Sequence, residues 1–81
     1  MHISSVIIHA HPDHMEATRS QLLAMEGVEI HAIETSGKLI VTLDTQDEKG
    51  TTDTFEQLSR VDGVMSATMV YHHFEPETDP K

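Results

Sequence analysis

Two segments of the chain that lie thirty-six residues apart carry the same pattern of residues. The segment "QLLAMEGV" (21–28) aligns with "QLSRVDGV" (57–64), with glutamine, leucine, an acidic residue, glycine and valine at equivalent places. A glycine that closes a helix and is followed by a β-branched residue is typical of a junction between a helix and a strand. The chain therefore repeats one unit, in which a helix is followed by a strand.

Runs of alternating or β-branched residues predict the strands. The expected strands are 3–10, 28–34, 38–44 and 64–74. Ser36-Gly37 separates the second strand from the third and supplies the flexible turn of a hairpin. The second and third strands are therefore expected to be antiparallel neighbours.

Apolar residues at helical spacing predict two helices. The first covers 13–26, and the second begins at Thr51, Thr52 or Asp53 and ends at Gly63. The residues expected to point inward from them are Met15, Leu22, Met25, Phe55, Leu58 and Val61. The intervening segment "TQDEKG" (45–50) is expected to be a polar loop.

Each half of the chain is thus a strand, a helix and a strand. Two such units with right-handed crossovers interleave into one antiparallel sheet with both helices on one side. The sequence predicts an α+β fold, a ferredoxin-like βαββαβ two-layer sandwich with a four-stranded sheet of order 4-1-3-2. We expect residues 1–75 to form this single domain and the acidic, proline-broken segment 76–81 to be disordered.

The composition argues against several classes of function. Five basic and fourteen acidic residues give a net charge of -9, which repels phosphate backbones and attracts cationic partners, so no nucleic acid is expected as a ligand. The chain has no cysteine, no glycine-rich phosphate loop and no nucleophile elbow, and we expect it not to be an enzyme. It also lacks a basic secretory start and an apolar run of about 20 residues, which predicts a cytoplasmic protein without membrane insertion.

The segment "HAHPDH" (9–14) has the H-x-H-x-D-H spacing that metallo-β-lactamase-type hydrolases use for a pair of metal ions. In that fold the motif supplies only half of the site, and the other ligands come from distant loops of a longer chain. We expect these side chains to be exposed at the end of the first strand and on the turn that follows. No metal or other cofactor is therefore predicted; a metal site at His9, His11, Asp13 and His14 is the alternative.

Alternation along the strands assigns residues to the side of the sheet that the helices leave open. Inward residues are expected to be Leu39, Val41 and Leu43 in the third strand and Met65, Ala67, Met69 and Tyr71 in the fourth, which leaves Val64 outward. For the first strand alternation is ambiguous, and we take Val6, Ile8 and Ala10 as core. The open face is then expected to carry Ser5, Ile7, His9, Ile33, Ile40, Thr42, Ser66, Thr68, Val70 and His72.

Apolar side chains interleaved with short hydroxyl groups form a floor on which a peptide can lie. The same floor suits burial against a second copy of the chain, and the residues alone do not decide between the two.

Three segments, "ISSVIIHAHPD", "SGKLIVTLD" and "VDGVMSATMVYHHFE", resemble the NapD family, small cytoplasmic chaperones of the periplasmic nitrate reductase system. The likeness runs from about Ile3 to Glu75, and its most specific part is "VYHHFE" at the end of the last strand. In its histidine content the chain departs from the family.

The resemblance implies a protein that binds the twin-arginine signal peptide of the catalytic subunit precursor. Binding would hold the precursor back from Tat export until molybdenum cofactor and an iron–sulfur cluster are inserted, and the chaperone itself holds neither. The candidates for contact with the arginines are Glu34, Asp44 and Glu75. Oligomeric state is expected to be a monomer or a weak homodimer.

Overall fold

The computed structural model describes the backbone of residues 2–74 and the side chains of residues 2–70. The strands are β1 (His2–Ala10), β2 (Val28–Ile33), β3 (Lys38–Thr45) and β4 (Val64–Phe74). The helices are α1 (Met15–Ala24), which follows a short 3-10 turn η1 (Pro12–His14), and α2 (Glu48–Ser59). Within this described part, neither α1 nor α2 has the length and apolar character needed to cross a bilayer.

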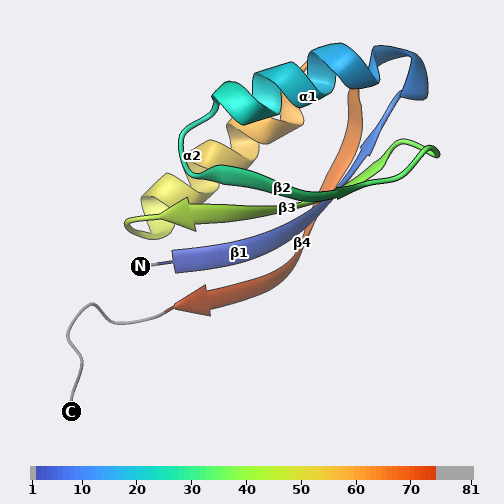
Figure 1. Cartoon of the computed structure of the whole chain (residues 1–81). Helices are drawn as coiled ribbons and strands as arrows, with labels where there is room; N and C mark the ends of the chain where they lie inside the picture. The colour runs from blue at the N-terminus through green and yellow to red at the C-terminus, as the bar shows by residue number, and fades with distance from the viewer. Residues whose placement is uncertain (1, 75–81) are drawn as a thin grey trace.

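The strands form one antiparallel sheet in the order β2-β3-β1-β4, with both helices packed on the same side (Figure 1). This is the predicted order read from the opposite edge, and it confirms the ferredoxin-like βαββαβ sandwich. We expected a domain of residues 1–75 followed by a tail of residues 76–81. The tail lies outside the described residues, so this division stays a prediction.

The core lies between the sheet and the helices, and its buried hydrophobic side chains, among the described residues, are all aliphatic. Its buried members are Val6, Ile8, Ala10, Leu22, Val28, Leu39, Val41, Leu43, Leu58 and Val61. Each large aliphatic side chain buried there contributes about 1.5–3 kcal/mol through removal from water. The choice of Val6, Ile8 and Ala10 as the inward set of the first strand is therefore correct.

Helix α2 begins earlier than the sequence predicted. Asp47 is its N-cap, and its carboxylate accepts a hydrogen bond of 2.7 Å from the backbone N–H of Gly50. The three residues that we expected as possible caps, Thr51, Thr52 and Asp53, all lie inside the helix. Thr51 is buried, and its hydroxyl donates to the Asp47 carbonyl at 3.1 Å. The second half of the segment expected to be a loop is thus helix, because an aspartate cap offsets the poor helix propensity of Gly50.

Strand β4 does not alternate regularly, because its pairing with β1 contains two bulges. His9 pairs with Ser66 and Ala10 with Val64, which leaves Met65 as the extra residue of the first bulge. Val64 therefore packs against the core and Met65 is 64% exposed, so the prediction that Met65 faces inward and Val64 outward is wrong. Beyond the bulge the predicted sides hold, since Ala67 and Met69 pack against the core.

The bulge predicts that two methionines of β4, Met65 and Met69, contribute differently to the stability of the fold. We expect Met69→Ser to lower the free energy of unfolding by about 1–3 kcal/mol, because it removes apolar contacts with the core. Met65→Ser is expected to change it by less than about 0.5 kcal/mol, because the side chain already faces water. Urea unfolding of both variants measures this, and equal losses would contradict the position of the bulge.

Candidate functional site

The side of the sheet opposite the helices is not covered by any of the described residues (Figure 1). At its centre, Ile7 of β1 lies directly opposite Ile40 of β3, and both side chains are half-buried. On the other side of Ile7 lies Thr68 of β4, and on the other side of Ile40 lies Ala32 of β2, so the four residues form one row across the sheet. Residues directly opposite in neighbouring strands share one face, so the open face has an apolar centre two strands wide. We call this surface the open face.

Most of the predicted residues meet on the open face. Ser5 lies opposite Thr42, and His9 lies opposite both Lys38 and Ser66. Together with the central row, this brings seven predicted side chains onto one surface: Ser5, Ile7, His9, Ile40, Thr42, Ser66 and Thr68. Short hydroxyl groups thus surround the two isoleucines, as the alternation predicted.

Ile33 is not on the open face, contrary to the prediction. A bulge at His31 shifts the pairing of β2, so that Ile33 lies opposite Leu39, a core residue. Ile33 lines a hollow on the helix side with Pro12 and Met15, and it is 42% exposed there. The prediction assumed that side chains alternate between the two sides along the whole of β2. The extra residue at the bulge breaks this alternation, so the side predicted for Ile33 is wrong.

The last two predicted residues lie in the less regular half of β4. Val70 is the extra residue of the second bulge, between the pairs Val6–Met69 and Ser5–Tyr71, and is 54% exposed. The inward prediction for Tyr71 and the outward prediction for His72 concern side chains outside the described residues.

A hollow opens at the end of the open face where β2 begins. It is lined by Ile3, Gly27, Val28, Glu29, His31, Thr42 and Asp44. The His31 ring makes a hydrogen bond of 2.8 Å to the hydroxyl of Thr42, and its Nε2 lies 3.6 Å from a carboxylate oxygen of Glu29. Two exposed carboxylates, Glu29 and Asp44, therefore flank an apolar and hydroxyl-lined depression that suits a cationic group.

The acidic residues that we expected to contact the arginines of the peptide do not lie together. Asp44 lies in this hollow, whereas Glu34 lines the helix-side hollow with Ile33. Glu75 lies outside the described residues.

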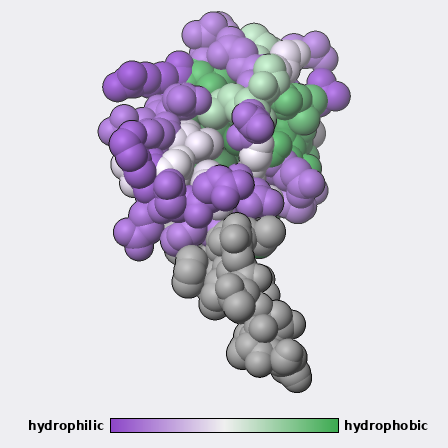
Figure 2. All heavy atoms as spheres, turned by 90° about the vertical axis from the view of Figure 1, so that its left-hand side faces the viewer, coloured by the Kyte–Doolittle hydropathy of each residue, from purple (hydrophilic) through white to green (hydrophobic). Residues whose placement is uncertain are grey.

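Hydrophilic residues cover most of the end of the molecule at which β1 begins, and the hydrophobic ones gather in one area (Figure 2).

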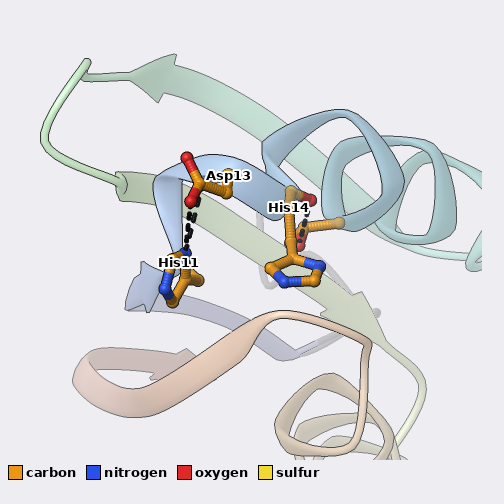
Figure 3. A network of polar contacts seen from close by, with 4 residues as sticks. His11, Asp13 and His14 are labelled. Carbon is orange, nitrogen blue, oxygen red and sulfur yellow. Dashed lines mark hydrogen bonds and ion pairs between the residues drawn. The ribbon is translucent and has the colours of Figure 1, made fainter.

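The histidine motif does not assemble a metal centre in the described part of the chain. Asp13 donates its backbone N–H to Nδ1 of His11 at 3.3 Å, and its carboxylate lies 3.9 Å from the same nitrogen (Figure 3). His14 joins this network through its backbone oxygen, which accepts from Thr18 at 2.9 Å, and His9 lies apart on the open face. No group of three potential ligands is found among the described residues, and the motif serves to cap η1.

Three residues of the hollow, Ile3, Gly27 and Glu29, were not among the predicted site residues. Ile3 belongs to the open face because it alternates with Ser5 and Ile7, and this signal was readable from the sequence. Glu29 was equally readable, since it alternates with Val28 at the start of its strand. Gly27 was not, because its contribution depends on its φ of 80° and on the close approach of Asp44.

A two-layer sandwich with one open sheet face is a scaffold for binding, and several proteins similar to this chain are named chaperones. A family model described as NapD protein matches residues 1–76, and the chain belongs to the NapD family. The relatives' shared name, chaperone, indicates a protein without enzymatic activity.

Individual relatives agree with this assignment. "Chaperone NapD" of Haemophilus influenzae is 31% identical over 72 residues, covering 88% of this chain and 77% of the relative. That of Escherichia coli K12 is 29% identical over 76 residues, covering 93% and 87%. The solution structure of the E. coli Tat proofreading chaperone NapD superposes with a TM-score of 0.81 at 28% identity, covering 98% of this chain and 84% of that one.

Zinc binding provides a test of the histidine motif. A ligand that binds only the native state raises the unfolding temperature, and the motif as folded does not converge on one ion. We expect zinc equimolar with the protein, or EDTA, to leave the unfolding temperature unchanged in the natural sequence and in a His11→Ala/His14→Ala variant. A zinc-dependent rise that the variant abolishes would show that the motif does bind a metal ion and would contradict this expectation.

Proposed function

We propose that this chain is a cytoplasmic chaperone that binds the twin-arginine signal peptide of the periplasmic nitrate reductase catalytic subunit precursor. The observation that carries the proposal is the open face, with its paired isoleucines Ile7 and Ile40 set among short hydroxyl groups. An apolar centre of this kind, left uncovered in the described chain, is typical of an interaction surface. Membership of the NapD family supports the choice of partner.

The chemistry of such a signal peptide matches the surface at two points. Its apolar stretch fits the centre of the open face, where Ile7, Ile40 and Ala32 lie in one row. Its arginines fit the acidic surroundings, since the chain carries a net charge of -9. Attraction of this kind speeds the encounter and weakens as salt is added.

The proposed mechanism is occupancy. A signal peptide whose twin-arginine motif lies against the chaperone is not readable by the Tat translocon, so the precursor stays in the cytoplasm while its cofactors are inserted. Release requires only a partner that binds the peptide better. No bond is made or broken by the chaperone, and the proposal needs no cofactor in this chain.

Calorimetry with a synthetic twin-arginine signal peptide from a nitrate reductase precursor tests the proposal. We expect binding that persists in EDTA, weakens with salt and is weaker for a twin-lysine peptide, because lysine cannot make the bidentate contact that arginine makes with a carboxylate. Absence of binding, with the chain found as a dimer through its open faces, would overturn the proposal in favour of self-association.

Two isoleucines on opposite sides of the sheet give a matched pair of variants. Ile40→Gln is expected to weaken peptide binding about tenfold, the loss of roughly 1.4 kcal/mol of apolar contact. Ile33→Gln removes an isoleucine on the helix side and is expected to leave the affinity unchanged. Urea unfolding of each variant separates lost binding from lost stability, and equal affinities would count against the open face as the binding surface.

A further inference from the structure

A groove runs along one edge of the molecule, between α1 and the edge strand β2. Because β2 stands at the end of the sheet order, one side of this strand has no neighbouring strand in the described chain. Two hollows on the helix side share Ile33 and follow one another along this edge. We call this surface the edge groove; it includes Pro12, Met15, Arg19, Leu23, Ile33 and Glu34.

Apolar side chains that face water line both walls of the edge groove. Met15, Arg19 and Leu23 are spaced four residues apart along α1, so they form one stripe on the helix. Leu23 is 54% exposed on this wall, and Ile33 is 42% exposed on the wall that β2 forms. They are two of the four large hydrophobic residues that are exposed in the described chain. An exposed apolar groove of this kind is typical of a site that a partner covers.

The edge groove is electrically neutral on a strongly acidic chain. Among the described residues that line it, only Arg19 and Glu34 carry a formal charge, and the two cancel. Neither forms an ion pair within the described chain. The net charge of -9 makes most orientations of two copies repulsive, but this groove can approach its own kind at little electrostatic cost. A cationic partner, by contrast, would be drawn to the acidic surfaces instead.

The edge of β2 is poorly suited to an added strand. The bulge at His31 interrupts the regular pairing of β2 with β3. A bulge twists an edge strand and breaks the row of backbone groups that an incoming strand needs, which is one way in which proteins prevent pairing between edges. An extended peptide would therefore lose backbone bonds there. The edge groove favours side-chain contact with a surface that is already folded, such as a second copy of the chain.

Twofold symmetry makes the edge groove complementary to itself. In a symmetric dimer the same patch serves both copies, so a contact between two different residues occurs twice. Arg19 lies midway along the stripe on α1, whereas Glu34 lies at the end of the groove, in the hollow of Pro12 and Met15. With the twofold axis near Ile33, two grooves that run in opposite directions bring Glu34 of each copy to Arg19 of the other.

We propose that two copies of this chain associate through their edge grooves in a twofold dimer, in which Arg19 of each copy pairs with Glu34 of the other. Leu23 and Ile33 of both copies are covered in this dimer, and both unpaired charges gain a partner. The open faces lie on the other side of the sheet and stay free, so the dimer does not depend on the proposed peptide binding. The contact involves one helix and one strand of each copy, and we expect a dissociation constant on the order of 0.1 mM.

Sedimentation equilibrium of the full chain, up to about 1 mM protein, tests the dimer. About 0.15 M salt screens the repulsion between two acidic chains beyond about 8 Å, and we expect the mean mass to rise toward that of two chains. Ile33→Gln is expected to weaken the dimer at least about tenfold, because each interface contains this side chain twice. Ile40→Gln changes the open face and is expected to leave the dimer intact.

These expectations are the reverse of those for peptide binding, so the same two variants separate the edge groove from the open face. A natural protein that stays monomeric at about 1 mM would overturn the dimer. A dimer that Ile40→Gln abolishes and Ile33→Gln preserves would place self-association on the open face and would overturn the edge groove as the interface.

Charge reversal tests the twofold pairing. Arg19→Glu places two carboxylates at each pair and Glu34→Arg places two cations there, so each variant alone is expected to dimerise at least about tenfold more weakly. In an equal mixture of the two variants, each pair again joins opposite charges. We expect the mixture to form a heterodimer with about the affinity of the natural dimer.

A matched pair of controls removes the effect of net charge. Arg60→Glu, at the C-cap of α2, and Glu56→Arg, within α2, change the net charge by the same amounts at exposed positions away from the edge groove. They are expected to leave the dimer unchanged, and urea unfolding shows that each variant is folded. Weakening by the controls as strong as that by the groove variants, or a mixture that regains nothing, would overturn the pairing of Arg19 with Glu34.

Discussion

The placement of both helices on one side of the sheet is the constraint on which the rest of this structure depends. Each helix connects two parallel strands of the interleaved sheet. Such crossovers are right-handed as a rule, and two crossovers of the same hand deliver both helices to the same side. The aliphatic core forms beneath them. The opposite side is left open as a direct consequence, so the proposed binding surface and the core arise from the same topological rule.

The bulges decide which side chains reach each surface. They add Met65 and Val70 to β4 and His31 to β2, and each extra residue changes the side on which its neighbours lie. The bulge in β2 turns Ile33 toward the helix side and leaves His31 beside Glu29 and Thr42 at the hollow. The acidic end of the open face thus owes its composition to an irregularity in the sheet.

Regular elements of this chain are predictable from the sequence, and irregular ones are not. In β3 regular alternation led to the correct core, because a one-residue slip would have exposed Leu39 and Val41 together. In β1 alternation was ambiguous, and the choice of Val6 and Ile8 as core is the one that the structure bears out. The start of α2 was predicted wrongly because Gly50 suggested a loop, while the deciding contact is the Asp47 cap. On the open face Ile7 and Ile40 were predicted correctly, whereas the hollow was not predicted, because it joins residues of three strands and a turn.

By itself the sequence determined the number, type and order of the elements, the topology of the sheet and most of the core, because these follow from local periodicity and from the handedness of crossovers. It also carried the family resemblance. The tertiary structure alone decided the registers of β2 and β4, since a bulge depends on how two strands fit together. It alone brought Glu29 and Asp44 to one hollow and set Lys38 at the far end, because charges distant in sequence become neighbours only through strand pairing.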